Sequence, residues 1–377
     1  MSTALRAALA AACLAALTQA HAAELRVGGR MHVDYAAYRA DVRQLDDAFL
    51  LRRAKLDVEG KLTDDWSFEA AYDFAAVYSV TDTGTRKEGA FKEGFDGVSL
   101  QYDGWKAADL EFGQFKVPFG LEELNSSNNI TFIERALVSD AFAPSRRIGV
   151  GASRNRQRYT LSAMGFGSSI DARDKGHGAA VRATYTPINT GQGGALVHLG
   201  LAVSLEHPSD DVKFNARPES RALDVRFLNT GNLDNIDRID RLGLEAGANA
   251  GPASLQAEWM RAAIKRDHGD PDAQLQGWYV MGSWVLTGQS RQYRHGRFRS
   301  VSVQPSAGAW ELAARFSHLD LDDGGVRGGE EDNITLGLNY YLNDRVRIML
   351  NHIDVHSERR GRKDNPQILL LRTQLSF

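Results

Sequence analysis

The sequence predicts an all-β fold: a sixteen-stranded antiparallel transmembrane β-barrel with inward-folded loops. Three observations predict it: an alternation of apolar and polar residues with period two, connections that are alternately short and long, and aromatic residues at the ends of the alternating segments. A soluble β-sandwich shows the same alternation, but its strands are usually only about 5–6 residues long. The segments here run to about ten residues, as transmembrane strands do.

Residues 1–22 predict a secretory signal peptide, and the barrel domain then spans residues 23–377. Arg6 supplies a lone positive charge before an Ala/Leu-rich core, and small residues at Ala20 and Ala22 mark a cleavage site. A segment of this kind is too short to cross a bilayer as a helix. We therefore expect an exported protein.

Each predicted strand has one apolar and one polar face. In the first strand, for example, Val27, Met31 and Val33 share one face, whereas Arg26 and Arg30 share the other. We expect strands at 24–36, 49–61, 66–77, 95–103, 108–116, 147–154, 158–167, 177–186, 195–206, 240–250, 253–264, 276–287, 309–319, 331–342, 345–356 and 366–377. This even number places both chain termini at the same rim, as bacterial barrels require.

The connections between these strands alternate in length. Short ones are rich in Gly, Pro, Asn and Asp, which supply turn dihedrals, and we place them at 63–65, 103–106, 155–157, 250–252 and 343–344. Long polar ones are expected at 37–48, 78–94, 117–146, 168–176, 207–239, 265–275, 320–330 and 357–365. Segment 288–308 is an exception, because it is long but lies at the short-turn rim.

Composition excludes several other classes of protein. The chain has 377 residues, is 43% hydrophobic and carries a formal net charge of −3, which argues against disorder and against a nucleic-acid partner. Its one cysteine, Cys13, lies in the predicted signal peptide and excludes a disulfide scaffold. No nucleotide fingerprint or nucleophile-elbow motif is present. We expect neither an enzyme nor a bound cofactor or metal.

The chain ends on Phe377, after a final segment that alternates up to its last residue. This ending resembles the closing-strand signal of outer-membrane barrels, which the barrel assembly machinery reads. The resemblance implies that this machinery is a partner, that outer-membrane lipid surrounds the barrel, and that the protein resides in a Gram-negative outer membrane.

The predicted inward faces carry charges of both signs. In a barrel of this size these faces line water, so most of these residues are expected to form a solvated wall with cross-strand ion pairs. Segment 117–146 is different, because it holds apolar residues such as Phe119, Phe132 and Phe142 without strand periodicity. A connection of thirty residues without strand periodicity in a compact barrel is usually functional. We expect this segment to fold into the lumen.

Two other connections concentrate basic residues. Segment 207–239 contains Arg217, Arg221 and Arg226. Segment 288–308 carries four arginines and no acidic residue. Arginines whose charge is not cancelled lower the barrier for an anion in a narrow pore. Alternatively, the basic run at 288–308 binds the phosphates of lipopolysaccharide or simply aids solubility.

Several segments resemble the phosphate-selective porin O and P family. They are GQFKVPFGLEEL (113–124) with NSSNNITFIER (125–135), LLRRAKLDVEGKL (50–62) with the following WSFEAAYDF, LGLEAG (242–247), and ITLGLNYYLNDRVRIMLNH (334–352). The resemblance implies a sixteen-stranded outer-membrane barrel, usually a homotrimer, with loops folded inward. In the family's best-known members, a ladder of arginines and a central lysine cluster pass phosphate or pyrophosphate.

Carried over residue by residue, the resemblance assigns the double arginine to Arg52 and Arg53, although strict alternation places these two on opposite faces. It also assigns the ladder arginines to Arg217, Arg221 and Arg226. Segment 117–146 corresponds to the inward loop. The central lysine cluster has no clear counterpart: Lys116 is the nearest lysine, and Glu122 and Glu123 stand in its place.

We therefore predict a passive, water-filled channel with a preference for anions, with inorganic phosphate, polyphosphate or similar anions as solutes. The predicted anion pathway comprises Arg52, Arg53, Lys116, Arg135, Arg146, Arg147, Arg217, Arg221 and Arg226. Two alternatives remain open. One is a general porin, or one for another solute, because acidic residues are as common as basic ones. The other is a structural or adhesive surface barrel whose long loops bind partners.

Overall fold

The computed structural model describes residues 25–75, 94–172, 174–191, 193–303 and 308–377, together with the backbone of the short strands β4 (Tyr78–Val80) and β5 (Arg86–Glu88). The predicted signal peptide lies outside the described residues. No helix in the described part of the chain is long and apolar enough to cross a membrane.

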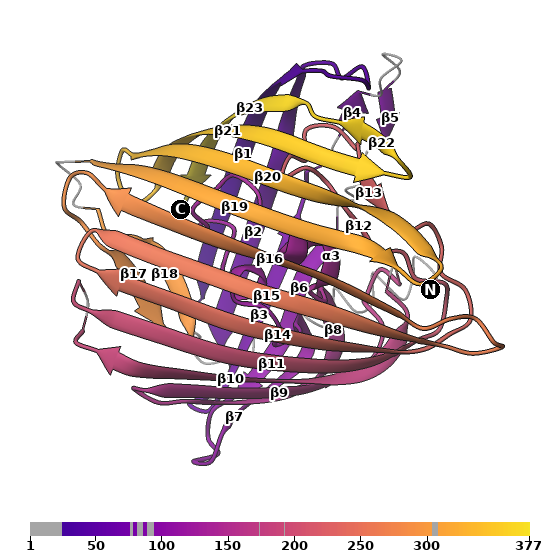
Figure 1. Cartoon of the computed structure of the whole chain (residues 1–377). Coiled ribbons are helices and arrows are strands. Elements are labelled where there is room, and N and C mark those ends of the chain that lie inside the picture. Colours follow the sequence, from indigo (N-terminus) through magenta and orange to yellow (C-terminus); the bar gives the residue numbers. More distant parts are fainter. Residues whose placement is uncertain are drawn as a thin grey trace.

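Sixteen antiparallel strands close into a barrel (Figure 1). They are β1 (Arg26–Arg39), β2 (Ala48–Lys61), β3 (Trp66–Asp73), β6 (Gly94–Tyr102), β7 (Asp109–Lys116), β8 (Arg146–Asn155), β9 (Tyr159–Phe166), β10 (Gly176–Asn189), β11 (Leu196–Pro208), β14 (Ile236–Ala250), β15 (Ala253–Arg266), β16 (Ala273–Val285), β19 (Ala309–Asp323), β20 (Val326–Tyr341), β21 (Val346–Arg359) and β23 (Gln367–Ser376). A short strand, β22 (Arg362–Asp364), pairs with β21 at the end of that strand. Pairing of β1 with β23 closes the ring, so both ends of the barrel sheet meet at the short-turn rim.

Each predicted strand corresponds to one barrel strand, which confirms the fold class. Two predicted connections are wrong. Residues 320–330 are mostly strand, because β19 extends to Asp323 and β20 begins at Val326. Residues 357–365 are also mostly strand, because β21 extends to Arg359 and β22 follows after a two-residue turn. In the first case the cause is visible in the sequence. The alternation continues through Leu319 and Leu321, whose side chains are buried. Gly324, with its φ of 55°, then allows a tight turn that the acidic sequence around it obscured.

The outward faces carry the apolar side chains. On β11, Leu199, Leu201 and Val203 are exposed, whereas the alternating His198 and Ser204 are buried toward the lumen. Aromatic residues sit near the strand ends, where the rings of Trp310 and Tyr340 stack with centroids 4.4 Å apart. Such residues mark the interfacial regions of a bilayer.

A β-bulge turns both residues of the double arginine toward the lumen. Arg53 lies opposite His32 of β1, and Leu51 lies opposite Val33, so Arg52 has no counterpart on the neighbouring strand. A bulge of this kind shifts the phase of side chains along the strand. The expectation that Arg52 and Arg53 lie on opposite faces is therefore wrong.

The connection between β7 and β8, residues 117–145, contains α2 (Leu121–Leu124) and α3 (Leu137–Phe142) and contacts wall residues from several strands. The backbone N–H of Glu122 donates to Glu258 of β15 over 2.9 Å, and that of Ile133 donates to Asn351 of β21 over 2.7 Å. Arg315 of β19 forms a 3.3 Å ion pair with Glu122. The segment therefore lies against the lumenal face of the barrel, with α3 visible behind β16 in Figure 1.

A buried apolar cluster fills the part of the lumen next to β15, β16 and β19. Phe119, Phe132 and Phe142 of the β7–β8 connection pack there with wall residues such as Met260 and Leu275. The connection between β11 and β14 adds the short strands β12 (Asn215–Ala216) and β13 (Leu228–Asn229) to this cluster. The larger open space in the described part of the lumen lies on the side of β1, β2, β3, β6, β7 and β8.

Candidate functional site: a charged cavity in the lumen

A cavity of about 810 Å³ lies between the inward connection and the wall strands β1 to β8. Ser169 and Asp171, from the connection between β9 and β10 at the long-loop rim, line it. Arg297 and Phe298, from the opposite rim, line it too. The cavity therefore reaches from the loops of one rim to those of the other, as a path for solutes requires.

Charged side chains dominate the lining of this cavity, with basic ones in slight excess. The basic residues are Arg30, Arg52, Arg53, Lys55, Lys116, Arg135, Arg146, Arg221, Arg297 and Arg299. The acidic residues are Glu59, Glu69, Asp73, Asp96, Glu111, Glu123, Asp171 and Asp174. How the two signs are paired decides which charges can act on a passing ion.

Arg52 and Arg221 attach to the inward connection. Arg52 forms a two-point ion pair with Glu134, with Nε–Oε1 at 2.7 Å and Nη2–Oε2 at 3.1 Å. Arg221 reaches Glu134 at 3.4 Å and also pairs with Asp140. Both predicted pathway residues thus line the cavity while their charges face carboxylates.

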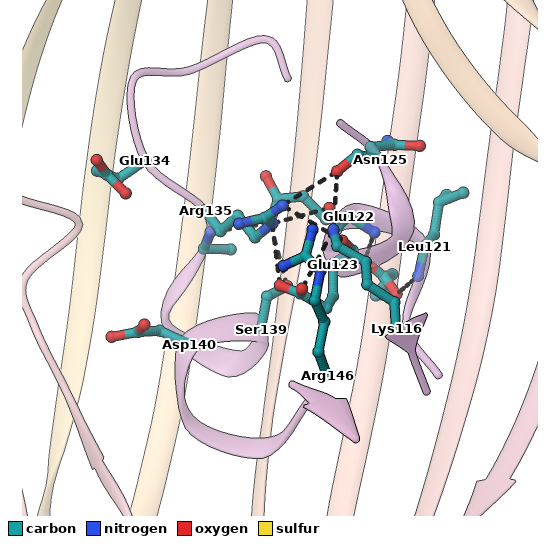
Figure 2. Close-up of polar contacts among 12 residues, drawn as sticks. Lys116, Leu121, Glu122, Glu123, Asn125, Glu134, Arg135, Ser139, Asp140 and Arg146 are labelled. Atoms are coloured by element: carbon teal, nitrogen blue, oxygen red, sulfur yellow. Dashed lines mark hydrogen bonds and ion pairs between the residues drawn. The ribbon is translucent and has the colours of Figure 1, made fainter. Parts of the chain in front are cut away.

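Glu123 binds two further predicted pathway residues (Figure 2). Its Oε1 lies 3.2 Å from Lys116 Nζ, and its Oε2 lies 3.2 Å from Arg135 Nε. Burial raises the pKa of the Glu123 carboxyl, but Arg135, Lys116 and Arg146 together lower it below its ordinary value. Glu123 is therefore an anion at neutral pH and neutralises part of the basic charge around it.

The remaining cavity cations on the wall also have acidic partners. Asp96 of β6 bridges Lys55 and Arg146, each with a nitrogen–oxygen distance of 2.7 Å. Arg53 lies 3.6 Å from Asp73. This arrangement matches the mixed, ion-paired wall expected from the sequence.

Three of the predicted pathway residues do not line the cavity. Arg147 forms a 2.5 Å ion pair with Glu206. Arg217 and Arg226 both pair with Asp224, at 2.5 Å and 2.7 Å. A role for these three in anion passage stays a prediction, whereas Arg52, Arg53, Lys116, Arg135, Arg146 and Arg221 are brought together.

The connection at 286–308 contributes two cations that the predicted pathway omits, Arg297 and Arg299. It forms a hairpin of β17 (Arg291–Arg294) and β18 (Arg297–Val301). Within the described ranges, neither Arg297 nor Arg299 has a carboxylate within ion-pairing distance of its side chain. Enclosure by the protein, together with Arg182 and Arg299, lowers the pKa of Arg297 to about 10 against the opposing effect of Glu111 and Glu69, so it stays charged at neutral pH.

Buried contacts hold this hairpin inside the barrel. Arg291 pairs with Glu311 of β19 at 2.6 Å, and Arg182 of β10 donates to the Gly296 carbonyl oxygen over 2.8 Å. Phe298 is buried against Leu121 of α2. In the sequence, the acid-free alternation of arginines over residues 297–299 was the signal for this role, but it did not distinguish a lumenal position from a lipopolysaccharide site.

The cavity also contains unpaired carboxylates. Glu59 of β2 lies directly opposite Glu69 of β3, and Glu111 of β7 lines the same space. Among the described residues, none of these three forms an ion pair within 4 Å. Charges of both signs that form no direct ion pair therefore face the cavity, where Glu69 and Glu111 act on Arg297 at longer range.

Comparison with known proteins agrees with this architecture. A family model described as phosphate-selective porin O and P matches residues 25–377. The chain belongs to this family. Porin O from Pseudomonas aeruginosa is 27% identical over 377 residues, covering 89% of this chain and 83% of that protein. An uncharacterised protein from Caulobacter vibrioides is 31% identical over 257 residues, which is 62% of this chain and 51% of its own length.

Solved porin structures share the fold of this member of the porin O and P family. An anion-selective porin from Comamonas acidovorans is similar with a TM-score of 0.57 and 14% identity, covering 94% of this chain and all of that chain. OmpT of Vibrio cholerae, in its trimer form, gives a TM-score of 0.58 at 8% identity and covers 95% of this chain and all of that chain. The family and the fold make the protein an outer-membrane porin, and they point to a channel rather than to an enzyme.

Proposed function

We propose that this porin is a passive channel with a preference for small anions. The observation that carries the proposal is the position of Arg297 and Arg299, two cavity cations that form no ion pair with an acidic residue in the described part of the chain. A charge in a narrow aqueous space with low-dielectric walls acts more strongly than it does in bulk water. These two arginines therefore raise the local concentration of anions and lower their barrier to entry.

Phosphate-like oxyanions are the solute class that we propose for this path. The planar guanidinium offers forked donors that match phosphate geometry, and the family description and the relationship to Porin O support the same class. The paired cations contribute less, because their carboxylates compete with a passing anion. We accordingly expect weak binding rather than a tight phosphate site.

A second candidate is a general porin without anion preference. The unpaired carboxylates Glu59, Glu69 and Glu111 favour it, because they attract cations into the same cavity. In that case the channel distinguishes solutes mainly by size. The sign of the reversal potential separates the two candidates.

We also propose a homotrimer inserted through the barrel assembly machinery, with no catalytic activity. The trimer form of OmpT supports the first part. Phe377 supports the second, because its backbone pairs with Gly29 at the β1–β23 seam over 3.0 and 3.1 Å while its side chain stays exposed.

The experiment is a measurement of reversal potential for the purified mature protein in planar bilayers under a potassium chloride gradient. In a channel that prefers anions, the reversal potential moves from zero toward the Nernst potential of chloride. The preference is expected to weaken in the Arg297→Ala/Arg299→Ala double variant. A reversal potential near zero or of cation sign in the wild-type channel contradicts the proposal and leaves the general porin.

A further inference from the structure

We infer that Glu123 is a built-in competitor for anions: its carboxylate occupies an oxyanion cradle formed by Lys116, Arg135 and Arg146. The inference rests on the proposed anion preference and names the residue that limits it. In this account the wild-type channel passes phosphate-like anions weakly because one of its own side chains fills the place where they would bind.

The geometry of the carboxylate is that of a bound anion. Its two oxygens contact different cations, Lys116 on one side and Arg135 on the other, both at 3.2 Å. Figure 2 shows the Arg146 side chain rising toward the same carboxylate from β8. A small oxyanion presents oxygens to surrounding donors in the same way. The side chains of Glu123, Lys116 and Arg135 are each about 15% exposed, so the cradle opens to the cavity.

The two cations that hold Glu123 do not depend on its carboxylate for their position. Arg135 donates to the backbone carbonyl oxygens of Glu122 and Asn125, each over 3.0 Å. Lys116 donates to the carbonyl oxygens of Glu123 and Asn125. These acceptors belong to the main chain. A change confined to the Glu123 side chain therefore leaves two cations in fixed positions beside an empty space, which favours anion binding.

Anchoring of the connection is also independent of Glu123. The neighbouring Glu122 makes the wall contact, because its Oε1 pairs with Arg315 and its Oε2 accepts from the backbone of Ala136. Glu123 points the other way, into the cavity. The two adjacent glutamates thus have different roles: Glu122 anchors the connection to the barrel wall, and the side chain of Glu123 lines the cavity.

The test compares Glu123→Ala with Glu59→Ala in planar bilayers. Both variants remove one negative charge from the same cavity, but only the first frees a pair of cations, because Glu59 has no ion-pair partner among the described residues. Chloride conductance is recorded while inorganic phosphate is added. We expect half-inhibition of Glu123→Ala at a phosphate concentration at least about tenfold lower than for the wild type, the effect of gaining one charge-assisted hydrogen bond. Glu59→Ala is expected to stay close to the wild type.

Equal sensitivity of the two variants would show that only the net charge matters and would overturn the inference. So would an unchanged phosphate sensitivity in Glu123→Ala. Glu123→Gln keeps the size of the side chain and serves if the alanine variant does not assemble; its neutral amide no longer competes as an anion, so it also gains sensitivity. Adding Lys116→Met to Glu123→Ala should remove the gain. The reversal potential of the wild type tests the proposed function separately, since it does not involve these variants.

Discussion

Arg52 of β2 and Glu134 of the inward connection form a buried two-point ion pair, with nitrogen–oxygen distances of 2.7 and 3.1 Å. Arg372 of β23 adds a third contact to the same carboxylate at 2.9 Å. Glu134 thereby ties the connection to two strands on either side of the β1 seam strand. The double arginine that the sequence marks as a transport element is, at Arg52, also a structural anchor.

Removal of the Glu134 carboxylate should destabilise the barrel. Glu134→Ala leaves the guanidinium groups of Arg52 and Arg372 buried with fewer acceptors, and breaking a buried pair in this way costs about 3–5 kcal/mol. We expect a lower urea midpoint in reversible unfolding from detergent or lipid. The control is Glu330→Ala, since Glu330 lies on an exposed outward position. A Glu134→Ala midpoint equal to that of the control contradicts the anchor.

The same pair predicts a pH dependence of stability. Burial raises the pKa of Glu134, but Arg52, Arg372 and Arg221 lower it to well below its ordinary value. The ion pair therefore stabilises the folded state fully above the unfolded-state pKa of about 4.3. This stability is lost as the pH falls from there through the depressed folded-state pKa. We expect the free energy of unfolding to hold between pH 7 and 5 and to decline below pH 4, with a smaller decline in Glu134→Gln.

Charge removal on the inward hairpin should change selectivity without changing the fold. Arg297→Ala/Arg299→Ala is expected to reduce the anion-to-cation permeability ratio severalfold, most strongly at low salt, where screening is weakest. Arg294→Ala is the matched control, because Arg294 belongs to the same hairpin and does not line the cavity. If the control shifts the ratio as much as the double variant, the position of the two arginines in the path is refuted.

Closure of the barrel seam should be sensitive to the size of residue 29. A Cβ on Gly29 would lie 2.6 Å from the Phe377 ring and 2.7 Å from the Lys55 carbonyl oxygen, closer than packed atoms allow. Gly29→Ala is expected to cost about 1–3 kcal/mol of stability, as overpacking does. When samples are heated to increasing temperatures before electrophoresis, the band of the folded protein should disappear at a lower temperature in this variant. Gly94→Ala serves as the control, because a Cβ there meets nothing within 4 Å. Identical behaviour of both variants would argue against a tight seam.

The barrel itself could be predicted from the sequence because membrane burial imposes a period-two pattern on every strand. Leu199, Leu201 and Val203 are examples. Each outward position contacts lipid and is therefore apolar, so the alternation can be read directly from the sequence. Departures from strict alternation, such as β-bulges, could not be predicted from the sequence. The bulge at Arg52 arises because Arg53 pairs with His32 of β1 while Leu51 pairs with Val33, and local periodicity does not encode this register shift.

The candidate site was predictable only in its residue types. Which arginine keeps a free charge depends on partners far away in the chain, such as Glu134 for Arg52 and Asp140 for Arg221. Arg297 forms no ion pair within the described residues, and its own sequence does not reveal that the hairpin carries it into the lumen. The family resemblance indicated an inward connection at these residues, but it did not indicate which of their charges form ion pairs.

The most direct test of the central claim is the reversal potential of the wild-type channel in a bilayer under a tenfold potassium chloride gradient. We predict a reversal potential displaced from zero toward the Nernst potential of chloride, and a smaller displacement in Arg297→Ala/Arg299→Ala. A wild-type potential of the opposite sign, or one that the double variant leaves unchanged, would contradict the claim.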